Sequence, residues 1–120
     1  MTGEQALADL MEVSEDVVSA LILDAEGRPV ASTVGDDAAE AAAEIVPAML
    51  AYGDSLRTGA TVTRLQALTA EGSVFLVREG SRTILAATGR DPVAGLVYHD
   101  LRAALRKLGR RTRQKADAAS

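Results

Sequence analysis

The chain has 120 residues, of which 48% are hydrophobic and 25% charged, proportions that fit one globular domain and exclude an intrinsically disordered chain. It contains no cysteine, which excludes a disulfide framework, a thiolate metal site and a cysteine nucleophile. With no tryptophan, one phenylalanine and two tyrosines, it lacks the aromatic residues on which nucleic-acid bases stack, so we expect no nucleic-acid partner.

Charge is distributed unevenly along the chain, whose net charge is −4. Residues 1–60 carry two basic and twelve acidic residues, a net −10, whereas residues 61–120 carry eleven basic and five acidic residues, a net +6. Solvated helix faces of opposite sign explain this asymmetry. The N-terminus lacks the basic start and apolar run of a secretion signal, and no apolar stretch reaches the roughly 20 residues of a membrane span, so we expect a cytoplasmic protein.

A capping box predicts a first helix at the N-terminus. Thr2 is followed three residues later by Gln5, and apolar residues recur at helical spacing to about Val13. The continuous apolar run over residues 17–23 is typical of a strand covered on both faces.

Turn residues after that strand predict a tight hairpin. The segment Asp24-Ala25-Glu26-Gly27 ends in a glycine that can adopt a positive φ, and a second strand resumes over residues 28–33. Pro29 cannot donate to a strand ladder, which places this second strand at a sheet edge or the proline at its start.

An alanine-rich segment predicts a second helix. Asp36 and Asp37 stand in its first turn, where the helix dipole favours acidic residues. Pro47 predicts a kink over residues 43–47 or a helix that restarts there. The apolar positions form a broad stripe of Ala39, Ala42, Ala43, Val46, Met49, Leu50 and Gly53, and from Gly53 the chain is expected to loosen into a loop.

Three more strands and a last helix are expected after residue 60. Residues 61–68, 73–78 and 82–88 read as a meander, in which Gly72 repeats the turn chemistry of Gly27. Asp91 as N-cap and Pro92 as first helical residue predict a helix that stops at Gly109. The basic residues 110–120 then form a frayed, disordered tail.

These elements predict the order α-β-β-α-β-β-β-α. Because each apolar face of the sheet must be covered, we expect an α/β (α+β) domain over residues 1–109, with a five-stranded, mainly antiparallel sheet sandwiched by helices.

No motif in the sequence indicates a catalytic, cofactor or metal site. A phosphate-binding Gly-x-x-x-x-Gly-Lys loop is missing, so the chain is not itself a GTPase, and His99, the only histidine, stands without a nucleophile elbow. Asp36 and Asp37 fit a helix cap better than a metal site. The basic tail can attract anionic lipid, but cations favoured by the dipole at a helix C-terminus explain it better. We therefore expect a protein that is not an enzyme.

The order of elements and three motifs resemble the Roadblock family of dynein light chains and its bacterial MglB-like members. The motifs are a strand ending in Asp24-x-x-Gly27, the hairpin Glu71-Gly72-Ser-Val-Phe-Leu-Val77, and Thr83-Ile-Leu-Ala86 leading into the last helix, and the match covers residues 4–108. The family's glycine before the first strand is replaced by Val17, Val18 and Ser19, and Pro47 in the second helix is a second departure.

The resemblance implies a homodimer in which the second helices lie side by side and the third strands meet edge to edge. The expected interface residues are Ala39, Ala42, Ala43, Val46, Met49, Leu50, Thr61, Thr63 and Leu65. The alanines equally suit contact with the domain's own sheet, and this alternative stays open. The resemblance further implies a platform for a small Ras-like GTPase, the class of partner that bacterial members regulate.

Two other functions fit the same order of elements. One is a profilin-like or PAS-like sensor of small molecules, which would keep a cavity with convergent polar groups. The small residues Ala86, Ala87 and Thr88 beside larger apolar ones indicate a filled core instead. The other is a purely structural dimer within a larger complex, which sequence does not separate from a GTPase platform.

Overall fold

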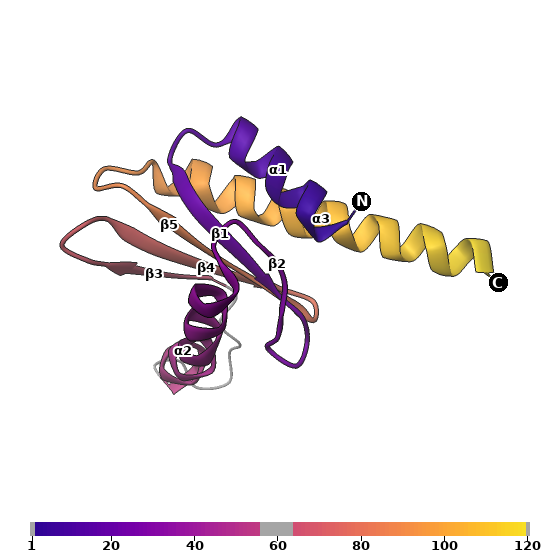
Figure 1. Cartoon of the computed structure of the whole chain (residues 1–120), viewed down its shortest axis with the longest axis horizontal. Helices are drawn as coiled ribbons and strands as arrows, with labels where there is room; N and C mark the ends of the chain where they lie inside the picture. Colours follow the sequence, from indigo (N-terminus) through magenta and orange to yellow (C-terminus); the bar gives the residue numbers. More distant parts are fainter. Residues whose placement is uncertain (1, 56–63, 120) are drawn as a thin grey trace.

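A computed structural model describes residues 2–55 and 64–119 (Figure 1). The elements in chain order are α1 (Gly3–Val13), β1 (Val17–Leu23), β2 (Pro29–Ser32), α2 (Asp36–Ser55), β3 (Arg64–Leu68), β4 (Ser73–Glu79), β5 (Arg82–Thr88) and α3 (Ala94–Ala119). The predicted order of helices and strands and the mixed α/β class are confirmed.

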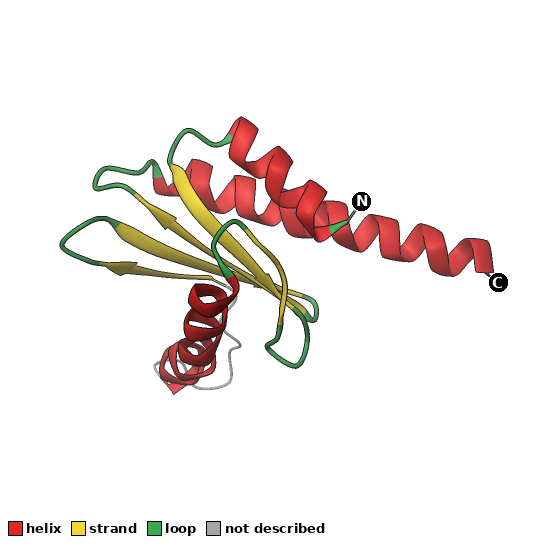
Figure 2. Cartoon of the chain, viewed as in Figure 1, coloured by secondary structure: helices red, strands yellow, loops and turns green. Residues whose placement is uncertain are grey.

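The described strands form one sheet in the order β2-β1-β5-β4-β3, and neighbouring strands pair antiparallel throughout. Helices α1 and α3 lie side by side on one face of the sheet, and α2 lies on the other (Figure 2). The expected sandwich and the edge position of β2 are therefore confirmed.

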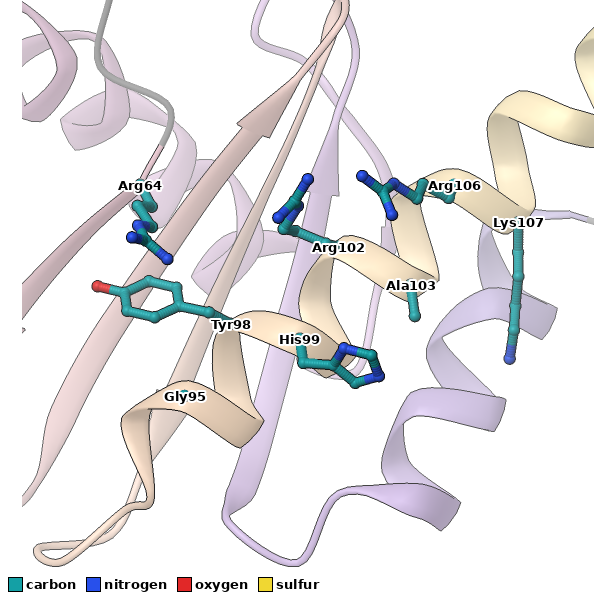
Figure 3. Close-up of a pocket in the computed structure, with 8 residues that line it drawn as sticks. All are labelled: Arg64, Gly95, Tyr98, His99, Arg102, Ala103, Arg106 and Lys107. Atoms are coloured by element: carbon teal, nitrogen blue, oxygen red, sulfur yellow. The ribbon is translucent and has the colours of Figure 1, made fainter.

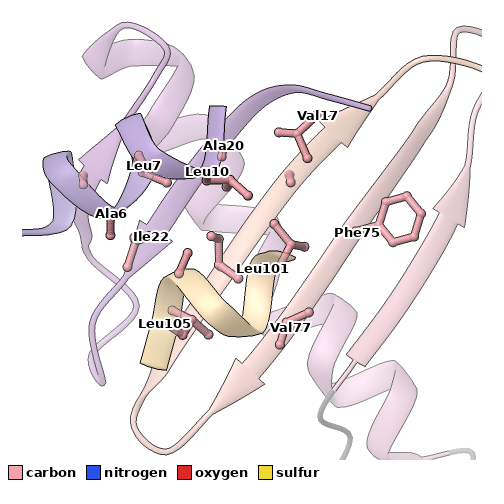
Figure 4. Close-up of a cluster of buried hydrophobic side chains, with 14 of the residues drawn as sticks. Ala6, Leu7, Leu10, Val17, Ala20, Ile22, Phe75, Val77, Leu101 and Leu105 are labelled. Carbon is pink, nitrogen blue, oxygen red and sulfur yellow. The ribbon is translucent and has the colours of Figure 1, made fainter. Parts of the chain in front are cut away.

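Each face of the sheet has its own apolar core. Under α1 and α3, Phe75 and Ile84 are fully buried with Leu10 and Leu101 in the larger cluster (Figure 4). On the α2 side, alternate residues of the same strands form a smaller cluster with the helix: Leu21, Leu23, Ala39, Ala43, Val46, Leu76 and Leu85. Residues 20–23 of β1 are buried on both faces, which is why this part of the predicted run is continuously apolar, whereas Val18 is 63% exposed.

The predicted capping box starts α1. The Thr2 hydroxyl accepts a hydrogen bond from the Gln5 backbone N–H at 3.2 Å, and the Gln5 side chain accepts one from the Thr2 N–H at 3.0 Å. These two bonds satisfy donors that a helix start leaves unpaired.

The two expected turn glycines act in different ways. Gly27 adopts a positive φ of 80°, and the Asp24 carboxylate closes its turn by accepting from the backbone N–H groups of Glu26 and Arg28, each at 2.9 Å. Gly72 is required by close packing instead, because a Cβ there would collide with the Thr88 carbonyl oxygen and lie 2.9 Å from that of Gly89.

Helix α2 continues through Pro47, so the predicted restart there is wrong. The helix runs without interruption from Asp36 to Ser55 and includes Gly53, where a loop was expected to begin. Pro47 removes one backbone hydrogen bond from the helix. Ala43 and Val46, in the turn before the proline, are buried against the sheet, and this packing compensates for the lost bond. Residues 56–63 lie outside the described part of the chain.

Both predicted ends of α3 are wrong. The helix begins at Ala94, after Val93, whose backbone N–H donates to the Asp16 carboxylate at 2.9 Å; Asp91 does not act as its cap. It also continues beyond Gly109 to Ala119 in place of the expected frayed tail. A glycine inside a helix costs only about 1 kcal/mol, and the Arg, Gln, Lys and Ala residues that follow are good helix formers.

Candidate functional site

Helix α2 buries one face against its own sheet. Ala39, Ala43 and Val46, three of the expected interface residues, pack in the smaller core. Ala42 and Leu50 are half-buried at the margin of that core. Ala39 and Ala43 therefore face the domain's own sheet, as the alternative interpretation expected.

A second apolar stripe of α2 is exposed. Its residues recur at alternating spacings of three and four: Ala38, Ala41, Ile45, Ala48 and Tyr52. Ile45 is 53% exposed and Tyr52 69%. This spacing aligns side chains along one helix face, as in the seam between two packed helices. Sequence reasoning missed this stripe because alanines stand on several sides of α2, although the spacing itself was readable.

An open apolar groove of about 260 Å³ adjoins this stripe. Ala38, Ala42 and Ile45 of α2 form one wall, and Leu21, Val74, Leu85 and Ala87 of the sheet are among its other lining residues. Ser19 supplies the one polar side chain of the lining. Helix α2 therefore leaves part of the apolar sheet face uncovered.

Strand β3 ends the sheet on the side opposite β2. It pairs with β4 on one edge, and no described strand pairs with its other edge. Leu65 is half-buried against the smaller core, whereas Leu68 is 79% exposed. The expected interface residues Thr61 and Thr63 lie outside the described residues, and the described strand begins at Arg64.

A basic hollow of about 370 Å³ lies on the opposite face of the sheet, beside α3 (Figure 3). The Arg64 guanidinium lies 5.2 Å from the centre of the Tyr98 ring, and that ring packs edge-on against Phe75 at 5.1 Å between centroids. Burial raises the pKa of the Tyr98 hydroxyl above 10.0, and the positive charge of Arg64 partly opposes this rise. His99 lines the hollow and is exposed.

Across residues 2–55 and 64–119, no three histidine or acidic residues gather where they could hold a metal ion. Within the same part of the chain, no helix combines the length and apolarity needed to cross a membrane. The described residues form an exposed apolar groove beside α2 and a basic hollow beside α3. Both kinds of surface suit contact with macromolecules.

Comparisons with solved structures show the same fold. A Roadblock/LC7 domain from Streptomyces avermitilis superimposes with a TM-score of 0.80 at 14% identity, covering 91% of this chain and 96% of that one. Myxococcus xanthus MglB gives a TM-score of 0.72 at 17% identity, covering 93% and 88%. A structure described as MglB with a tetrameric arrangement gives 0.69 at 15% identity, covering 90% and 85%.

Sequence comparison identifies the family. No curated protein matches the chain significantly in sequence. The family model described as Roadblock/LC7 domain matches residues 4–88, from α1 to the end of β5. Because this match extends over more than half of the sequence, the chain belongs to the Roadblock/LC7 domain family.

Proposed function

We propose that this chain forms a homodimer through α2 and β3, and that the dimer is a cytoplasmic, non-catalytic platform that binds a small Ras-like GTPase. The observation that carries the proposal is the exposed apolar stripe of α2 beside an apolar groove in the sheet face. Family membership supplies the class of partner, because the Roadblock resemblance implies binding to Ras-like GTPases.

A second copy of α2 fits this surface. Ala38, Ala41 and Ala48 carry small side chains, so two helices can approach closely along the stripe. Ile45 of each copy then reaches the groove beside the other copy's helix, in a self-complementary two-fold contact. Ile45 is 53% exposed in the monomer, so burying the rest of its side chain contributes roughly half of the value for a fully buried isoleucine, about 1 kcal/mol, and the symmetry doubles this contribution.

Strand β3 provides a second contact in the proposed dimer. An unpaired edge with exposed backbone groups tends to pair with another strand. Two β3 edges that meet across the same two-fold axis would join both sheets into one. Leu65, on the α2 side of the strand, would then lie close to the helix pair.

The groove is better suited to a helix than to a small molecule. Small-molecule sites combine an apolar lining with several polar groups that orient the ligand. In this groove Ser19 is the single polar side chain of the lining. This composition favours the dimer over the profilin-like or PAS-like sensor.

Binding to a Ras-like GTPase tests the proposed partner. A candidate GTPase from the same organism, loaded with GDP or with a non-hydrolysable GTP analogue, is titrated into the chain by isothermal calorimetry. We expect one nucleotide form to bind at least about tenfold more tightly, because the switch segments of these proteins differ between nucleotide states. Absence of binding by both forms, with the chain itself dimeric, would leave a structural dimer and overturn the GTPase part of the proposal.

A further inference from the structure

The groove between β3 and α3 is lined by four arginines: Arg64, Arg78, Arg102 and Arg106. The hollow beside Tyr98 adjoins a second one of about 420 Å³, and the two share Arg64 of β3 and Arg102 of α3 in their linings. Arg102 and Arg106 project from the same side of α3, whereas Lys107 projects from the other (Figure 3). The groove is therefore lined by guanidinium groups from three separate elements, β3, β4 and α3.

Positive charge exceeds negative charge in this groove. Arg106 donates to the Glu79 Oε1 atom at 3.2 Å, and Arg102 lies 3.9 Å from the same oxygen. Arg64 contacts the Tyr98 ring and forms no ion pair with a described carboxylate. Arg102 and Arg106 thus share the Glu79 carboxylate, and Arg78 pairs with Asp54 at 3.4 Å. The arginines of the groove outnumber its carboxylates, and arginine carries five N–H donors.

We propose that this groove binds an acidic, carboxylate-rich segment of a partner protein. Glu79 shows that the Arg102 and Arg106 pair accepts a carboxylate in this geometry. Arginine presents a planar set of donors that match carboxylate oxygens in pairs. Arg64 also stacks on Tyr98 in the free protein. Because its side chain is already restrained, it loses less conformational entropy when a ligand binds.

The surroundings of the groove favour a narrow protein segment over a membrane or a nucleic-acid duplex. Helix α1 lies against α3 and exposes Glu4 and Glu12, while Asp9 pairs with Lys107 at 3.5 Å. A flat bilayer or a wide duplex on α3 would also approach these acidic residues. Among the described side chains, the arginines of the groove form a positive strip between α3 and β3, which an extended acidic segment can follow without meeting α1.

The proposed groove shares Arg64 with β3, the strand assigned to the second dimer contact, whereas Arg102 belongs to α3 and lies outside both proposed dimer contacts. The groove lies on the α3 face of the sheet, whereas the exposed stripe of α2 lies on the opposite face. A failure of either proposal is therefore distinguishable from a failure of the other.

Fluorescence anisotropy with a fluorescein-labelled oligo-glutamate peptide tests the groove in the full-length chain. We expect the peptide to bind, and its affinity to fall as NaCl is raised from about 50 to 500 mM. Arg64→Gln and Arg102→Gln should each weaken binding about three- to fivefold, as expected for exposed ion pairs. Arg28→Gln, which removes an equal charge from the exposed β1–β2 turn, is the matched control and should leave binding unchanged.

Three results would overturn the proposal. The first is no peptide binding by the wild-type chain at low salt. The second is an Arg28→Gln effect as large as those of the two groove variants, which would show that binding follows net charge alone. The third is tighter binding to phosphatidylglycerol vesicles or duplex DNA than to the peptide, again lost in the groove variants. Unchanged thermal melting of each variant shows that its fold is intact.

Discussion

The backbone at Gly72 lies against the end of β5, and no other residue fits there. In Gly72→Ala, the added Cβ would meet the carbonyl oxygens of Thr88 and Gly89, which belong to the backbone and cannot rotate away. We expect the free energy of unfolding to fall by about 1–3 kcal/mol, measured by urea denaturation. Gly89→Ala is the control, because a Cβ there has no atom within 4 Å. Equal effects of the two substitutions would contradict this packing.

The Tyr98 hydroxyl makes the free energy of unfolding depend on pH in the alkaline range. Burial raises its pKa in the folded chain above the ordinary 10.0, so the folded state favours the neutral phenol. The resulting stability is complete below about pH 10 and is lost as pH rises through the higher folded pKa. Urea unfolding at about pH 8 and pH 11 should therefore show a smaller alkaline loss of stability for Tyr98→Phe than for the wild type. A Tyr98→Phe loss equal to that of the wild type would contradict the account.

At the scale of elements, the start of α3 is capped by the side chain of a residue that is distant from it in the sequence. The Asp16 carboxylate, in the loop after α1, accepts from the Val93 N–H just before the helix. Asp16→Ala should therefore destabilise the fold by about 0.5–2 kcal/mol, the cost of losing a helix cap. Asp91→Ala should change stability by less than about 0.5 kcal/mol, since Asp91 is exposed and is not the cap. Thermal or urea unfolding that ranks the two variants in the opposite order would refute this assignment.

Strands were easier to predict from sequence than helix ends. The bounds of β1 and β5 agree with the predicted ranges 17–23 and 82–88, because each is a continuous apolar run between turn residues. The start of α3 was misplaced because Asp91-Pro92 is a strong local signal, whereas the observed cap comes from Asp16 through the tertiary fold. A local sequence pattern does not reveal a hydrogen-bond partner that is distant in the sequence.

The candidate surfaces were predicted only in part. The sequence singled out the second helix, but alanines on several of its sides hid which face turns inward. Only the packed sheet shows that Ala39 and Ala43 are buried and that Ile45 is exposed. The contact of Arg64 with Tyr98 joins the edge strand to the last helix, and no periodic pattern relates those two residues. Their pairing follows from the strand order.

At the scale of the whole molecule, the fold pairs some of the opposite charges that the sequence carries in its two halves, since Asp54 pairs with Arg78 and Asp9 with Lys107. Acidic residues of α1 and α2, such as Glu12 and Glu44, are exposed, as solvated helix faces require. Arg102 and Arg106 of α3 line the groove beside β3 and share the Glu79 carboxylate. The sheet thus has a predominantly apolar association surface on the α2 side and a basic groove on the α3 side.

Dimerisation through α2 is the central claim, and light scattering behind a sizing column tests it most directly. The wild-type chain should elute with about twice the monomer mass of 12.5 kDa. Ile45→Lys places a charge in the proposed helix seam and should give the monomer mass. Leu96→Lys makes the same kind of change at an exposed position of α3 and should leave the dimer intact. A monomeric wild-type chain, or an Ile45→Lys variant that remains dimeric, would contradict the account.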